Sequence, residues 1–157
     1  MTTVCERDES GLVIISVEMD GKYQLKMVLD TGATHTTLDA NALYLLGYEL
    51  KDSLGVVQIE TANGVVETDV FGLRQLSALG LHKTDFVVQV YDFLAHGIFS
   101  DYSGLLGLDF LEGTTFCINT TDNLISVIPV TKLAARRECE NSGLVGTRVG
   151  VRTPRAG

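Results

Sequence analysis

The sequence of 157 residues contains no tryptophan, two prolines and three cysteines. Cys5, Cys117 and Cys139 are too few and too scattered for the disulfide scaffold of a small secreted domain, and no Cys or His pair has zinc-site spacing. No apolar run approaches the roughly 18 residues that a membrane span requires, and no basic-then-apolar leader opens the chain. We therefore expect a soluble, cytoplasmic protein that makes no membrane contact through this chain.

Basic residues are also scarce, because 12 Lys and Arg stand against 20 Asp and Glu, a net charge of −8. Residues 1–130 hold 6 basic and 18 acidic residues, whereas residues 131–157 hold 6 and 2. An acidic body repels a phosphate backbone, so nucleic acid is not an expected partner. The composition predicts an N-terminal extension over 1–10, one folded domain over 11–130 and a basic flexible tail over 131–157.

The rest of the composition is globular: 45% of residues are apolar and 20% are charged, which excludes wholesale disorder, collagen and coiled coil. Apolar, β-branched segments alternate with turn dipeptides, and this pattern is typical of strands. Asp20-Gly21 separates two expected strands, and Asn63-Gly64 favours a type I′ turn between two more. The strands are expected at 12–19, 23–29, 56–61, 65–71, 74–79, 85–91, 115–119 and 124–128.

Helices are predicted to be few and short. Asp39 is placed to cap a helix over 40–46, Gly47 is placed to end it, and a helical turn is expected at 108–112. No βα alternation suggests a parallel sheet. The fold class is therefore mostly β with one or two short helices.

Asp30-Thr31-Gly32-Ala33-Thr34 follows directly after an expected apolar strand, where the chain must turn sharply. A glycine at this point allows a tight turn and leaves backbone N–H groups free to bond the carboxylate, which favours its ionised form. By itself, Asp-Thr-Gly is weak evidence, because the tripeptide occurs by chance and an ordinary surface turn is the first interpretation of it. Asp30 is thus a candidate catalytic residue, and the rest of the sequence has to decide between a catalytic loop and a surface turn.

A second signature follows at Gly104-Leu105-Leu106-Gly107-Leu108-Asp109. Taken in order, the Asp-Thr-Gly loop, the Asn-Gly hairpin and this apolar-apolar-Gly segment resemble the retropepsin-like aspartic proteases, the single-lobed relatives of pepsin, over about residues 10–130. The resemblance implies a closed or partly open β-barrel-like lobe and an aspartic endopeptidase. It implies peptide hydrolysis by activated water, with no metal and no organic cofactor.

The resemblance also implies roles for single residues. Asp30 corresponds to the catalytic aspartate, and the residues that support its loop are Thr31, Gly32, Ala33, Leu106 and Gly107. The tip of the substrate-covering flap corresponds to Thr61, Ala62, Asn63, Gly64 and Val65. The segment 92–103, which contains Phe93 and His96, is either a specificity loop or a packed surface loop.

Aspartic proteolysis needs two carboxylates that share one proton, because one activates water while the other protonates the carbonyl oxygen. The sequence has a single Asp-Thr-Gly, so the second aspartate must come from another copy across a two-fold axis. We therefore expect a homodimer that acts on a peptide or protein substrate. In the family the termini pair across that axis, and the matching strands here are 124–128 and the segment near Leu12. Self-processing within the basic tail is a further hypothesis.

Two other interpretations stay open. Residues 29–34 also fit the Asp-x-Gly-x-Thr phosphate loop of actin-like and sugar-kinase ATPases, although the chain is too short for their two lobes and lacks a Walker-type lysine. A retropepsin-like dimer can also serve as a catalytically silent binding or assembly module, since one fold hosts several functions. Replacement of Asp30 separates this last alternative from a protease.

Overall fold

The computed structural model describes residues 1–97 and 101–130, so the predicted tail over 131–157 lies outside the described residues. The elements in chain order are β1 (Thr2–Val4), β2 (Glu6–Arg7), β3 (Val13–Met19), β4 (Tyr23–Leu29), β5 (Thr37–Asp39), α1 (Ala40–Leu45), a 3-10 helix (Leu50–Asp52), β6 (Gly55–Thr61), β7 (Gly64–Ala78), β8 (Leu81–Tyr91), β9 (Gly104–Leu106), β10 (Thr114–Asn119) and β11 (Leu124–Pro129). Within the described ranges no helix is long and apolar enough to cross a membrane. The mostly β fold class is confirmed.

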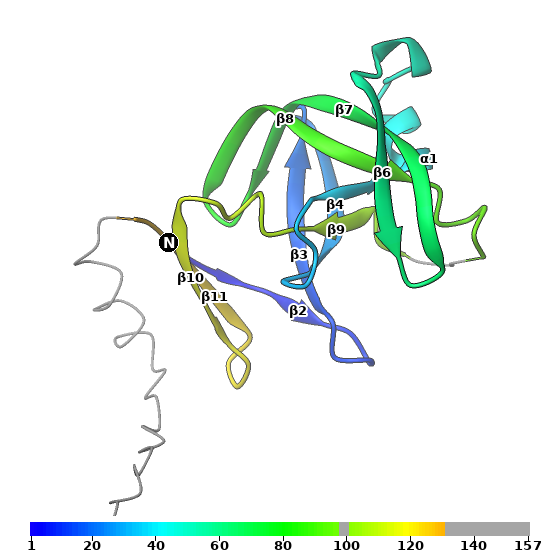
Figure 1. The fold of residues 1–157 in the computed structure, drawn as a ribbon. Coiled ribbons are helices and arrows are strands. Elements are labelled where there is room, and N and C mark those ends of the chain that lie inside the picture. The colour runs from blue at the N-terminus through cyan, green and yellow to red at the C-terminus, as the bar shows by residue number, and fades with distance from the viewer. Residues whose placement is uncertain (98–100, 131–157) are drawn as a thin grey trace, which may run out of the picture.

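The larger sheet has eight strands in the order β2-β3-β4-β9-β5-β8-β7-β6, and β3 also pairs with β7. The pairings from β3 through β4, β9, β5, β8 and β7 back to β3 run as a ring that is not closed into a barrel (Figure 1). Strands β1, β11 and β10 form a separate three-stranded sheet. Of the two expected forms, closed or partly open, the partly open one is therefore found.

Strand β9 lies between the two strands that flank the Asp30 loop. It pairs in parallel with β4 and antiparallel with β5, so the chain leaves β4, turns through residues 30–36 and returns on the far side of β9. Strand β5 also pairs in parallel with β8. The lack of βα alternation does not predict these short parallel pairings, because the long chain between the partners supplies the crossover.

Both predicted hairpins form. Asp20 and Gly21 close β3–β4 with φ of 52° and 71°, as a tight turn requires. The β6–β7 hairpin pairs as far as Thr61 and Gly64 around the two residues Ala62 and Asn63. Its turn is not the expected type I′, because at the tip only Gly64, with φ of 118°, has a positive φ, whereas type I′ needs two such central residues.

A third hairpin is longer than the sequence pattern indicates. The strands expected at 65–71 and 74–79 are one strand, β7, because Gly72 continues the ladder opposite Val87. Leu79 and Gly80, with φ of 53° and 76°, then close the turn into β8, which starts earlier than predicted. The Leu79 side chain is buried, and this burial offsets the cost of a left-handed leucine.

The predicted helix cap is confirmed. The Asp39 carboxylate accepts hydrogen bonds from the backbone N–H groups of Asn41 and Ala42 at 3.1 and 3.3 Å, and Gly47 follows the helix with φ of 86°. The helical turn expected at 108–112 is a run of hydrogen-bonded turns rather than a helix, in which the Leu111 N–H donates to the Leu108 carbonyl at 3.0 Å. Gly113, with φ of 77°, ends this run.

The first residues of the chain belong to the small sheet. Strand β1 pairs with β11, and the Met1 amino group donates to the Val127 carbonyl at 3.0 Å. Strand β10 pairs with the other edge of β11, so both edges of β11 are occupied within one chain. Within one chain, the strand beside β11 is β1, and the segment near Leu12 precedes β3.

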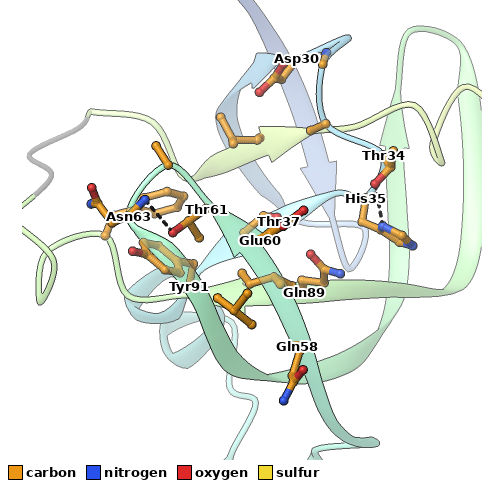
Figure 2. A pocket seen from close by; sticks show the side chains of 17 residues that line it. Asp30, Thr34, His35, Thr37, Gln58, Glu60, Thr61, Asn63, Gln89 and Tyr91 are labelled. Atoms are coloured by element: carbon orange, nitrogen blue, oxygen red, sulfur yellow. Dashed lines mark hydrogen bonds between the residues drawn. The ribbon is translucent and has the colours of Figure 1, made fainter.

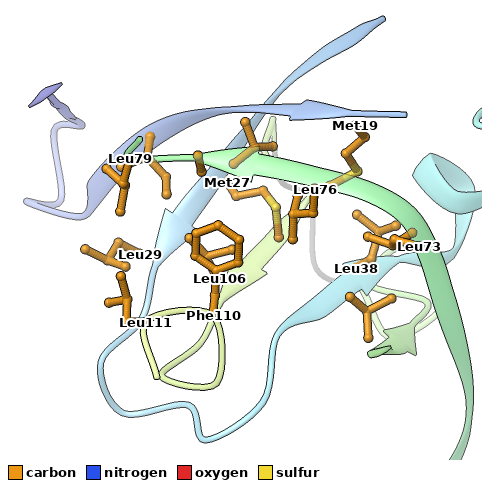
Figure 3. Close-up of a cluster of buried hydrophobic side chains, with 14 of the residues drawn as sticks. Met19, Met27, Leu29, Leu38, Leu73, Leu76, Leu79, Leu106, Phe110 and Leu111 are labelled. Atoms are coloured by element: carbon orange, nitrogen blue, oxygen red, sulfur yellow. The ribbon is translucent and has the colours of Figure 1, made fainter. Parts of the chain in front are cut away.

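The hydrophobic core lies inside the ring of strands (Figure 3). Met19 and Met27 from the first hairpin pack with Leu76 of β7 and Leu106 of β9, and all four side chains are fully buried. Phe110, just after β9, is also fully buried. Its ring packs edge to face against the Phe86 ring, with 5.7 Å between the two centroids. The segment that follows β9 is thus anchored in the core.

A polar network fixes the β3–β4 turn to β7. The Asp20 carboxylate, whose side chain is only 5% exposed, accepts hydrogen bonds from the Arg74 guanidinium at 2.6 Å, the Tyr48 hydroxyl at 3.0 Å and the Gln75 N–H at 3.2 Å. Burial, reinforced by the adjacent Asp20 charge, raises the pKa of Tyr48, so its hydroxyl stays protonated and can donate. The network therefore joins three segments that are distant in the sequence.

We predict that Asp20→Ala lowers the free energy of unfolding by about 3 kcal/mol, because it leaves buried donors without their acceptor. Asp85→Ala is the matched control, since Asp85 also has a positive φ, of 50°, but is exposed. Urea denaturation of both variants measures the difference. Equal losses in the two variants would show that backbone strain, and not the network, accounts for the effect.

Candidate active site

Asp30 is the first residue after β4, at the start of the loop that leads to β5. Its backbone N–H donates to the Leu106 carbonyl of β9 at 3.0 Å, and its carbonyl accepts from the Ala33 N–H at 3.2 Å. The Gly32 N–H donates to Asp30 Oδ1 at 2.9 Å. The backbone thus holds the carboxylate through one N–H donor, that of Gly32.

The return of the loop is fixed by a residue pair that sequence reasoning did not identify. Thr36, which is fully buried, donates through its N–H and its hydroxyl to the Asp109 carboxylate at 2.9 and 2.7 Å. The Thr36 hydroxyl in turn accepts from the Gly107 N–H at 3.1 Å. A carboxylate placed three residues beyond an apolar pair is the only sequence signal that points to this contact.

Glycine is required where β9 meets the loop. A Cβ atom on Gly107 would lie 2.6 Å from the His35 carbonyl carbon, and one on Gly104 would lie 2.2 Å from the Thr37 carbonyl oxygen. Real Cβ atoms do not approach backbone atoms this closely. The backbones of β9 and the Asp30 loop are therefore in direct contact.

A cleft of about 890 Å³ lies between the Asp30 loop, the β6–β7 hairpin and β8 (Figure 2). The predicted site residues that line it are Asp30, Gly32, Ala33, Thr61, Ala62, Asn63 and Val65. Of the other predicted residues, Leu106 and Gly107 are buried, whereas Thr31 and Gly64 are exposed. The fold thus brings the Asp-Thr-Gly loop and the predicted flap tip, which are far apart in the sequence, to one cleft.

Several lining residues were not anticipated from the sequence. Gln89 and Tyr91 come from the end of β8 and Thr37 comes from β5, whereas Phe93, two residues beyond β8, belongs to the segment already considered as a specificity loop. His35 also lines the cleft, and its Nδ1 lies 3.0 Å from the Thr34 hydroxyl. These positions are not recognisable as a site in the sequence, because the β5–β8 pairing that brings them beside Asp30 is long-range.

The lining of the cleft is acidic. Among the described residues, the carboxylates that line it are Asp30 and Glu60, and no Lys or Arg does so. Within residues 1–97 and 101–130, no group of three or more His, Cys, Asp or Glu side chains is arranged to hold a metal ion. This lining offers the Asp30 carboxylate as a base in a groove.

Comparison with known proteins decides the family. A family model described as "Aspartyl protease" matches residues 15–110. The chain belongs to the aspartyl protease family. Its fold is similar to the crystal structure of a retropepsin-like aspartic protease from Rickettsia conorii, with a TM-score of 0.62 and 21% sequence identity, covering 82% of this chain and 92% of that chain. No curated protein matches the sequence.

Membership in the aspartyl protease family confirms the resemblance stated from the motifs. The Asp30 loop of this retropepsin-like fold joins two strands of an open β ring and does not form part of a two-lobed ATPase. The interpretation of residues 29–34 as an actin-like or sugar-kinase phosphate loop is therefore not supported. The activity that the family and the fold support is that of a protease.

We predict that Thr36→Val lowers the free energy of unfolding by about 2 kcal/mol, because an isosteric side chain removes a buried hydroxyl with two partners. Thr84→Val, at an exposed position of β8, is the matched control and should change stability little. Chemical denaturation gives both values. A Thr36→Val protein as stable as the control would contradict a bracing role for the hydroxyl.

Proposed function

We propose that the chain is a homodimeric aspartic endopeptidase in which Asp30 of each copy forms the catalytic dyad. The observation that carries this proposal is the position of Asp30 in the cleft, where the Gly32 N–H holds its carboxylate opposite the β6–β7 hairpin. Thr31, Gly32, Ala33, Leu106 and Gly107 are assigned to the support of the dyad. Residues Thr61 to Val65 are assigned to the flap tip that covers substrate.

The proposed chemistry needs two carboxylates with one proton between them. One carboxylate accepts a proton from water as the water attacks the peptide carbonyl carbon, and the other gives its proton to the carbonyl oxygen. Collapse of the tetrahedral intermediate then breaks the C–N bond, with a proton delivered to the leaving amine. Water is the nucleophile, so no covalent enzyme intermediate forms.

The surroundings of the loop fit an approach by a second copy. Thr31 and Gly32 are exposed beside Asp30, which leaves this face of the loop open to a symmetry-related loop. Because both edges of β11 are occupied within one chain, pairing between two β11 strands requires one of its neighbours to be displaced. We infer that an undistorted dimer uses the outer edges of β1 and β10 or the loops instead.

An extended peptide suits the proposed groove. Strand β6 is the last strand of the larger sheet, so its outer edge can pair with a substrate backbone while side chains enter the cleft alternately. A silent binding module would use the same groove. The intact Asp-Thr-Gly loop favours the protease, because binding alone has no use for a carboxylate held in this way.

We predict that Asp30→Asn abolishes peptide hydrolysis while the fold and the dimer persist, because the amide cannot act as a base. The test measures cleavage of a peptide mixture by mass spectrometry and molar mass by light scattering. Unchanged cleavage by the variant would overturn the assignment of Asp30. Circular dichroism shows whether a variant that has lost cleavage is still folded. The mixing experiment that follows shows whether it still pairs with wild-type chains.

Mixing tests the dyad directly. If each site needs two Asp30 residues, a ninefold excess of Asp30→Asn chains that exchange freely should reduce the activity of wild-type chains to roughly a tenth, by random pairing. A ninefold excess of Asp85→Asn chains, which keep Asp30 and change only an exposed position, is the control and should raise the total activity about tenfold. Activity that is insensitive to the Asp30→Asn chains would indicate a site that is complete within one chain.

Self-processing is a separate proposal that rests on the composition of residues 131–157. We expect the intact mass of wild-type protein to fall over time through cleavage after Val130, whereas Asp30→Asn protein stays full length. Intact-mass spectrometry at several pH values measures this. Equal fragmentation of both proteins would point to a contaminating protease, and stable masses in both would end the hypothesis.

A further inference from the structure

One end of the cleft carries a group of three rings at the end of β8. Tyr91 and Phe93 both line the cleft, and their ring centroids are 5.2 Å apart at an interplanar angle of 66°. His96 stacks on Tyr91 with 4.4 Å between centroids and an angle of 24°. We call these three residues the aromatic shelf. Figure 2 shows Tyr91 below Thr61 and Asn63 of the hairpin tip.

The shelf is held by its own backbone turn. The Asp92 side chain accepts from the Ala95 N–H at 2.9 Å, and the Asp92 carbonyl lies 2.7 Å from His96 Nδ1. The Phe93 N–H also bonds the Asp39 carboxylate at 3.4 Å. His96 itself is exposed and does not line the cleft, so its contact with the site runs through the Tyr91 ring.

The rest of the cleft differs in character from the shelf. Gln89 lies two residues before Tyr91 on β8, so both side chains project from the same face of the strand, roughly 7 Å apart. The side chains of an extended peptide repeat with the same spacing on one face. A bound peptide therefore meets an amide at one position and a ring at the next position on that face.

We propose that Tyr91 and Phe93 form a subsite for a large apolar side chain, preferably an aromatic one, and that His96 is a positioning residue that fixes the Tyr91 ring. Ring–ring contacts favour an aromatic guest beyond the area it buries. The assignment deepens the proposed function and rests on it. Under this proposal, the described residues 92–97 of the segment 92–103 act as a specificity loop.

Cleavage selectivity provides the first test. A proteome-derived peptide library digested by wild-type protein should show enrichment of Phe, Tyr, Trp or Leu at one fixed position from the cleaved bond. Tyr91→Ala and Phe93→Ala should reduce that enrichment about tenfold while the preferences at other positions persist. Unchanged enrichment in both variants would overturn the subsite.

The separate effects on KM and kcat distinguish a positioning role of His96 from a merely structural one. With one aromatic peptide from the library, His96→Ala should raise KM several-fold with kcat nearly unchanged, and His96→Phe, which keeps a ring for stacking, should restore KM. His82→Ala is the matched control, because His82 is an exposed histidine at the other end of β8. A fall in kcat without rescue by phenylalanine would contradict a positioning role.

A binding experiment separates this proposal from the proposed function. Because the chain has no tryptophan, the indole of a blocked pentapeptide, Trp between alanines, is the only one in the mixture. Asp30→Asn protein should shift its emission to shorter wavelength in a saturable way, and adding Tyr91→Ala should weaken binding about tenfold. Lack of cleavage by wild type together with this binding would reject the protease and keep the subsite, whereas equal binding with and without Tyr91 would reject the subsite.

Discussion

The hydrogen bonds between Thr36 and Asp109 connect two segments that lie far apart in the sequence, and the geometry of the cleft depends on them. Thr36 donates twice to Asp109 and accepts from Gly107, so one buried residue fixes both the return of the loop and the exit of β9. At the other end of the loop, Asp30 donates to Leu106. Both ends of the loop are therefore attached to residues 106–109, which set the position of Asp30.

Those residues are in turn attached to the core. Leu106 and Phe110, on either side of Asp109 in the sequence, are fully buried. Residues 106–110 therefore cannot move without exposing apolar surface, at a cost of about 25 cal/mol per Å². The hairpin opposite is different, because Val56 and Val65 are exposed and its tip is held mainly by its own ladder. We expect the β6–β7 hairpin to move away from the cleft at a lower cost in free energy than residues 106–110. This difference suits a groove that admits a peptide chain.

The local features of this fold are predictable and the long-range ones are not. Asp20-Gly21, the Asp39 cap and the Asp30 loop depend on neighbouring residues, and the sequence pattern predicts each of them. The Thr36–Asp109 contact and the position of Tyr91 on the cleft depend on residues fifty or more positions apart, for which the sequence carries at most the weak signal of a carboxylate beyond an apolar pair. The hairpin tip is an intermediate case, since Asn63-Gly64 predicts the turn but not its type.

The environments of the two threonines that frame the loop bear on the need for a second copy. Thr36 is fully buried and bonded to Asp109, whereas Thr31 is exposed next to Asp30. The loop is thus held on one side by its own chain and exposed on the other, at Thr31, where the proposed dimer would bring a second carboxylate. Two carboxylates about 4 Å apart repel by about 4 kcal/mol at an effective dielectric of 20, so a shared proton is what allows them to meet. In the proposed dimer, the carboxylate that holds the shared proton is the acid and the other is the base, whereas a single chain has only one such carboxylate.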